Sequence, residues 1–171
     1  MDTVKHNKLF LSLGVIGSFL KIYGYLFQIK PELFFITGAV ALMTTAIAFR
    51  LFYFIALEFI LAAGHTALVL GLGLYIQVAL PVLLCFQLVI FYLMSDKREH
   101  SFSLIIGVMA VLLLSLGFSY NNQWIFFSGS LGIAGYALYE AYKGLYPCYI
   151  WAALNGLFAF IALYKIIEVP L

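Results

Sequence analysis

Long apolar runs, each closed by a short polar, glycine or proline break, cover nearly the whole chain. A helix needs about 20 apolar residues to cross the hydrocarbon core of a bilayer. Runs of that length predict seven spans, at residues 8–29, 33–49, 51–72, 75–94, 102–119, 123–143 and 148–167. The stretch 33–94 has few breaks. If it held only two spans, each would be too long for an ordinary bilayer, so three spans are expected there.

The composition excludes a water-soluble fold. Hydrophobic residues make up 65% of the chain and charged residues 9%, whereas soluble domains carry roughly 25% charged residues. Too few polar side chains remain to cover a surface that faces water. We therefore expect an all-α integral membrane protein, a compact bundle of about seven transmembrane helices that forms one polytopic domain over residues 1–171.

The basic residues predict the orientation of this bundle, because cytoplasmic loops are enriched in Lys and Arg. With the amino terminus inside, the inner side collects Lys5, Lys8, Arg50, Lys97, Arg98 and Lys143, and the outer side has Lys30 and Lys165. The uncharged breaks at 71–73 and 121–123 also fall outside. We expect a cytoplasmic amino terminus in a multi-pass protein of the bacterial inner membrane.

A weak internal repeat links the first two spans with the last two. A shift of 118 residues pairs Leu13, Gly14, Gly17, Leu20, Gly38 and Ala41 with Leu131, Gly132, Gly135, Leu138, Gly156 and Ala159. The paired spans would run in opposite directions, as in carriers built from inverted repeats. These residue types are common in the chain, so chance matching is the alternative.

Four ionisable residues stand out inside predicted spans, namely Lys21, Glu58, His65 and Glu140, because an ionisable group there costs at least about 2.5 kcal/mol to insert. Glu58 and His65 are seven residues apart, which places them on one helical face about 10 Å apart along the axis, able to line one ion or proton path. Lys21 can either extend to the outer interface or pair with Glu58. We favour the pair, since Lys21 is the one cation predicted well inside a span. Hydrogen bonds that only fix packing are the alternative for Glu58 and His65.

A second polar group lies near the cytoplasmic end of the sixth predicted span. Glu140 and Lys143 are spaced as helical neighbours, and Tyr136 and Tyr139 precede them. Such a pair is commonly a surface ion pair, but the tyrosines also suit an aromatic vestibule for an organic solute. Asn155 in the seventh span can hydrogen-bond across helices and completes the candidate path.

Glycines recur every three residues in the sixth predicted span, at Gly129, Gly132 and Gly135. Small residues let membrane helices approach closely without lipid between them. We expect this span to pack at the centre of the bundle.

Several function classes lack their residues. No HExxH, GxSxG or Walker motif is present, and the two isolated cysteines have no metal or redox spacing. The net charge is only +2 and the basic residues are scattered along the chain, which excludes a nucleic-acid interface. We expect no catalytic residue, metal or cofactor.

The chain is therefore interpreted as a carrier or channel for an ion or small organic solute. A non-catalytic subunit or assembly factor of a larger membrane complex is one alternative, and an intramembrane enzyme acting on a lipid is another. The expected partners are the lipid bilayer, a small solute or ion, and a membrane-protein partner or a second copy of the chain.

Overall fold

The structure is a computed structural model that describes residues 2–94 and 101–168, and these residues form helices and turns without a strand. The helices are α1 (Asp2–Phe27), α2 (Pro31–Ala48), α3 (Phe52–Val69), α4 (Leu74–Met94), α5 (Ser101–Ser119), α6 (Gln123–Tyr142), the short 3-10 helix η2 (Tyr146–Cys148) and α7 (Tyr149–Glu168). Each α-helix matches one predicted span, and the all-α prediction is confirmed. The charged loop at 95–100 lies outside the described residues.

Four helix ends share one turn geometry. The second residue after the helix has a positive φ at Arg50, Gly71, Asn121 and Gly144, and the next backbone N–H donates to the carbonyl five residues earlier, at 2.9 to 3.2 Å. This turn satisfies carbonyl groups that the last helical turn leaves open. Glycine adopts the left-handed conformation without strain, which is why two of the four breaks read from the sequence contain it.

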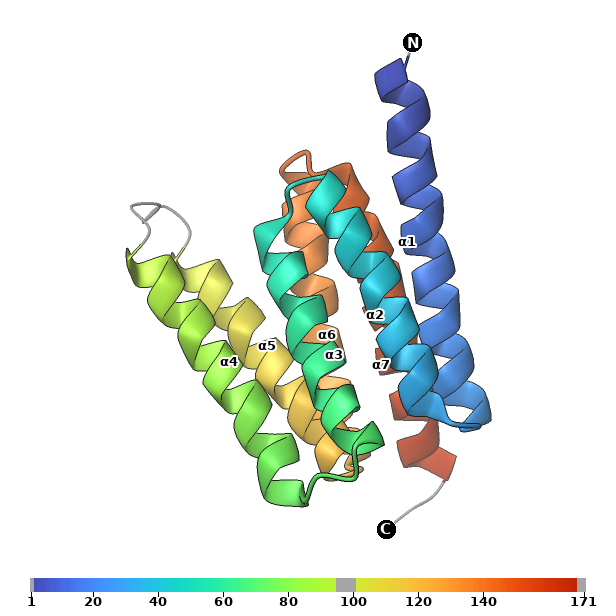
Figure 1. Ribbon diagram of the computed structural model, residues 1–171, viewed down its shortest axis with the longest axis vertical. Coiled ribbons are helices and arrows are strands. Elements are labelled where there is room, and N and C mark those ends of the chain that lie inside the picture. Colours follow the sequence, from blue (N-terminus) through green and yellow to red (C-terminus); the bar gives the residue numbers. More distant parts are fainter. Residues whose placement is uncertain (1, 95–100, 169–171) are drawn as a thin grey trace. The chain divides into compact units, whose positions relative to one another are not determined.

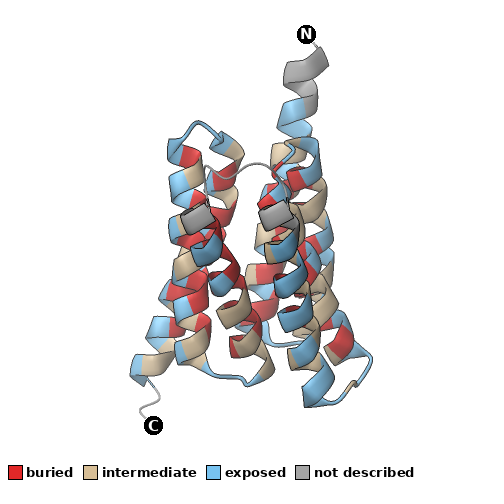
Figure 2. Ribbon diagram, turned by 90° about the vertical axis from the view of Figure 1, so that its left-hand side faces the viewer, coloured by how far each residue is buried: buried red, intermediate tan, exposed pale blue. Residues whose placement is uncertain are grey.

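By length and apolarity, four helices among the described residues can cross a bilayer. They comprise Asn7–Phe27, Pro31–Ala48, Phe52–Val69 and Tyr146–Glu168, and Leu74–Ile90 and Leu104–Ser119 are shorter apolar helices. Large apolar side chains such as Phe19, Phe52 and Phe160 are more than half exposed, which suits lipid rather than water. Buried and exposed residues alternate along each helix (Figure 2). The fold is consistent with an integral membrane protein.

The helices cluster into two compact units, Met1–Gly73 and Leu74–Leu171. In the first unit α2 packs against both α1 and α3 (Figure 1). In the second unit α6 packs against α5 and α7, and α4 packs against α5. That the two units act as one membrane domain stays a prediction.

Glycines bring neighbouring helices of each unit into backbone contact. A Cβ added to Gly17 of α1 would lie 2.8 Å from the carbonyl oxygen of Gly38 in α2. A Cβ added to Gly129 of α6 would meet the backbone nitrogen of Leu114 in α5, and one added to Gly132 would lie 2.7 Å from the Cβ of Ala110. Gly135, by contrast, has nothing within 4 Å of such an atom. The close packing expected of the α6 glycines therefore holds for Gly129 and Gly132 and not for Gly135.

Candidate functional site

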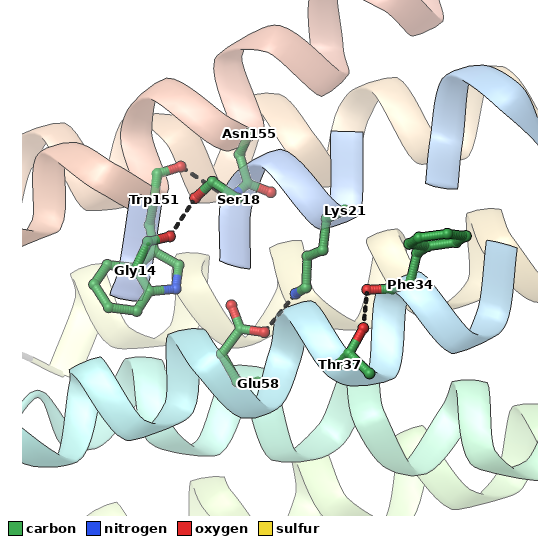
Figure 3. Close-up of polar contacts among 8 residues, drawn as sticks. All are labelled: Gly14, Ser18, Lys21, Phe34, Thr37, Glu58, Trp151 and Asn155. Carbon is green, nitrogen blue, oxygen red and sulfur yellow. Dashed lines mark hydrogen bonds and ion pairs between the residues drawn. The ribbon is translucent and has the colours of Figure 1, made fainter. Parts of the chain in front are cut away.

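Lys21 and Glu58 form a buried ion pair inside the first unit. The Lys21 Nζ donates to the Glu58 Oε2, joining α1 to α3, and Figure 3 shows the Lys21 side chain extended toward that carboxylate. The side chains are 2% and 1% exposed, respectively. The expected pairing of these residues is confirmed.

Gly38 of α2 makes room for this pair. A Cβ added at Gly38 would lie 2.7 Å from the Lys21 Cγ and 2.7 Å from the Gly17 carbonyl oxygen. The Lys21 side chain therefore passes α2 at a glycine, where no side chain occupies the space. Gly38 was not expected in the site, because the spacing of residues along one helix does not show which residues of a neighbouring helix they face.

The depth of the pair follows from the helix bounds. Lys21 lies six residues before the end of α1 and Glu58 six residues after the start of α3, which is about 9 Å of helix in each case. At that depth an unpaired charge is costly. Each buried charge compensates the other, so removing either one leaves an uncompensated buried charge.

His65 lies on the same helix as Glu58 and is buried. Its ring is stacked on Phe35 of α2, with ring centroids 4.5 Å apart and planes 9° apart. The stack fixes the plane of the imidazole and leaves the ring edge, which carries both nitrogens, as its hydrogen-bonding surface. The structure thus places His65 in the first unit with the ion pair. Its expected role in a path stays a prediction.

Thr45 makes a polar contact between α2 and α1 that was not expected from the sequence. It is fully buried in α2, and its hydroxyl lies 2.9 Å from the carbonyl oxygen of Phe10 in α1 and 3.0 Å from that of Ala41 in its own helix. Threonine is common in membrane helices for such contacts, so residue type alone gave little signal.

The tyrosine cluster lies on α6, in the second unit. The Lys143 Nζ is 3.8 Å from the Glu140 Oε1 and 4.2 Å from the centroid of the Tyr139 ring. Tyr139 is nearly half exposed, whereas Tyr136 is of intermediate exposure. These contacts are those of a surface ion pair with a cation–π contact, and an aromatic vestibule stays a prediction.

Asn155 is buried in α7. Its Nδ2 donates to the Trp151 carbonyl oxygen at 2.9 Å, one turn earlier in the same helix, as Figure 3 shows. The hydrogen bond expected across helices is thus seen along the helix instead. The candidate residues divide between the units, with Lys21, Glu58 and His65 in the first and Tyr136, Tyr139, Glu140 and Asn155 in the second.

Among the described residues, no three His, Cys, Asp or Glu side chains are grouped as metal ligands would be. Cys85 and Cys148 are both buried free thiols. Comparison of the chain with protein-family models, curated proteins and solved structures gives no match. Any function is therefore inferred from the geometry of the first unit.

Proposed function

We propose that the protein is a small membrane carrier for an ion or small organic solute, with the Lys21–Glu58 pair as its polar centre. The observation that supports this proposal is the burial of both charges between helices that are apolar enough to span a bilayer. Two apolar side chains of similar volume would join the helices without the cost of desolvating two ions. A charged pair is more costly, but its partners are exchangeable.

The exchange has a definite chemistry. A proton or metal cation that reaches Glu58 competes with the Lys21 ammonium, and an anionic group competes with Glu58 for Lys21. Either competitor displaces one member of the pair, and the charge of that member must then be compensated by a proton gained or lost or by a second bound ion, which couples solute binding to the movement of a second charge. His65 lies two turns further along α3, and its imidazole, which can both donate and accept a hydrogen bond, suits a step that moves protons.

The division into two compact units also supports a carrier. Many secondary transporters move one bundle of helices against another around a binding site near the bilayer midplane. Two units joined through a single connection at residues 73 and 74 give the chain parts that can move as bodies.

The test is flux into proteoliposomes of defined lipid, with H⁺, Na⁺ and K⁺ gradients and a panel of small amines, carboxylates and sugars. We expect Glu58→Gln to lower the flux about tenfold or more, the effect of losing one charged hydrogen bond of roughly 1.5 kcal/mol. Glu32→Gln is the matched control, because Glu32 is a carboxylate in the first turn of α2, outside the candidate path. Its flux should stay within about twofold of the unmodified protein.

Two outcomes would contradict the proposal. One is flux no higher than in empty liposomes across the whole panel. The other is a Glu58→Gln protein that elutes as a single folded species and transports at the unmodified rate. A protein that purifies only with another membrane protein would favour the assembly-factor alternative.

A further inference from the structure

The hairpin α1–α2 and the hairpin α5–α6 have the same contacts at equivalent positions. A Cβ added at Gly38 would lie 2.7 Å from the carbonyl oxygen of Gly17 and 2.7 Å from the Cγ of Lys21. A Cβ added at Gly129 would lie 2.9 Å from the carbonyl oxygen of Ala110 and 2.7 Å from the Cα of Leu114. Equivalent residues therefore differ by 93 in number between α1 and α5, and by 91 between α2 and α6.

The sequence carries the same two shifts. Adding 93 pairs Gly14, Val15, Leu20 and Gly24 with the identical residues Gly107, Val108, Leu113 and Gly117. Adding 91 pairs Phe35, Gly38 and Ala46 with the identical residues Phe126, Gly129 and Ala137, and pairs Leu42 with Ile133. The α2 and α6 residues in these pairs are all buried. The contacts and the residue types therefore agree on the same two shifts, 93 for the first helix of each hairpin and 91 for the second.

The hydrogen bonds and turns follow the alignment as well. The Thr37 hydroxyl donates to the carbonyl oxygen four residues earlier at 2.8 Å, and the Ser128 hydroxyl, 91 residues on, does so at 2.9 Å. Lys30, the residue before α2, has φ 46°, and Asn121, the second residue before α6, has φ 50°. Other helical Ser and Thr hydroxyls make the same bond, so the alignment rests on the glycine contacts and the residue pairs.

The third helices align through the turns that precede them. Leu51, the residue before α3, has φ −88° and ψ 76°, and Leu145, the residue before η2 and α7, has φ −85° and ψ 68°. Adding 94 pairs six buried residues of α3, Phe54, Leu57, Glu58, Ile60, Leu61 and His65, with six buried residues, Cys148, Trp151, Ala152, Leu154, Asn155 and Ala159.

We infer that α1–α3 and α5–α7 are two copies of one three-helix unit in the same chain order, with α4 as the connection between them. The positions of Lys21 and Glu58 correspond in the second copy to Leu114 and Ala152, both buried. One copy thus holds the charged centre, and the other holds its apolar counterpart. This inference stands whether or not the chain transports a solute.

The direction of the repeat follows from the number of helices. If α1 to α4 each cross the bilayer, α5 begins on the same side as α1, so the copies are parallel repeats, a known arrangement in transporters. The inverted pairing at a shift of 118 matches the tightly packed Gly17 and Gly38 with Gly135 and Gly156, which have nothing within 4 Å of an added Cβ. The parallel pairing matches tight positions with tight positions, so we favour it.

Transplanting the ion pair tests the equivalence. Leu114→Lys alone places an uncompensated charge in the second copy and should lower the melting temperature and the folded yield in mild detergent. Adding Ala152→Glu should recover most of both losses. Adding Asn155→Glu instead, which tests a register three residues away, should not. Rescue by Asn155→Glu, rescue by neither change, or no loss from Leu114→Lys would each overturn the inference.

A second set of variants keeps the inference testable if Leu114→Lys abolishes folding. Gly38→Ala and Gly129→Ala should lower the melting temperature by similar amounts, because each added methyl meets backbone atoms of the preceding helix. Gly135→Ala and Gly156→Ala should not lower it, since both positions are open. Losses at Gly135 and Gly156 that match those at Gly38 would favour the inverted pairing and overturn the parallel one.

Discussion

Removing one member of the Lys21–Glu58 pair should cost far more stability than removing both. Lys21→Met strands the Glu58 carboxylate in a site where its side chain is 1% exposed. Breaking a buried ion pair from one side typically costs about 3 to 5 kcal/mol. Glu58→Gln strands the ammonium, which is 2% exposed, and should cost a similar amount.

The double change Lys21→Met with Glu58→Gln removes both charges, and two neutral side chains no longer need each other. Replacing a buried pair by neutral residues is often close to neutral in stability. The three variants should therefore deviate from additivity by at least about 3 kcal/mol, the upper end of the range for residues in contact.

The assay is equilibrium unfolding in mixed micelles by SDS titration, followed by helical circular dichroism and checked by thermal melting. The partly exposed pair Glu140–Lys143 provides the matched cycle, with Glu140→Gln, Lys143→Met and their double. Its atoms are 3.8 Å apart and its side chains are 14% and 28% exposed, so the coupling should be below about 1 kcal/mol. Strict additivity in the Lys21–Glu58 cycle would refute the reasoning and would leave Glu58 alone as the functional candidate.

Three further predictions concern packing, capping and topology. Gly38→Val should destabilise the first unit more strongly than Gly135→Val destabilises the second, because a Cβ at Gly38 meets the α1 backbone at 2.7 Å; thermal melting compares them. Asn122→Ala should cost about 1 kcal/mol in the same assay, since the Asn122 Oδ1 accepts from the backbone N–H groups of the second and third residues after it at 3.0 and 3.1 Å. In a cysteine-free background, Asn121→Cys should react with an impermeant thiol reagent from outside the cell and Gly144→Cys only after permeabilisation; the reverse pattern would overturn the orientation.

The sequence by itself determined the helices of this protein. A bilayer has no water to satisfy backbone groups, so each apolar run must satisfy them within its own helix. Run length and breaks are therefore enough, and the predicted bounds agree with α1 to α7 within a few residues, apart from the longer amino-terminal end of α1. The lysine and glutamate of the buried pair were also visible in the sequence, because a charge within an apolar run needs a partner.

Only the tertiary structure decided which faces meet. The helical period shows which residues share one face of a helix, but not which residues of another helix pack against that face. The passage of Lys21 over Gly38 and the stacking of Phe35 on His65 therefore could not be predicted from spacing. The repeat shows the same limit. Matching residue types alone suggested a shift of 118, whereas the contacts of Gly38 and Gly129 favour shifts of 93 and 91, because close helix approach depends on where a glycine faces and not on how often glycine occurs.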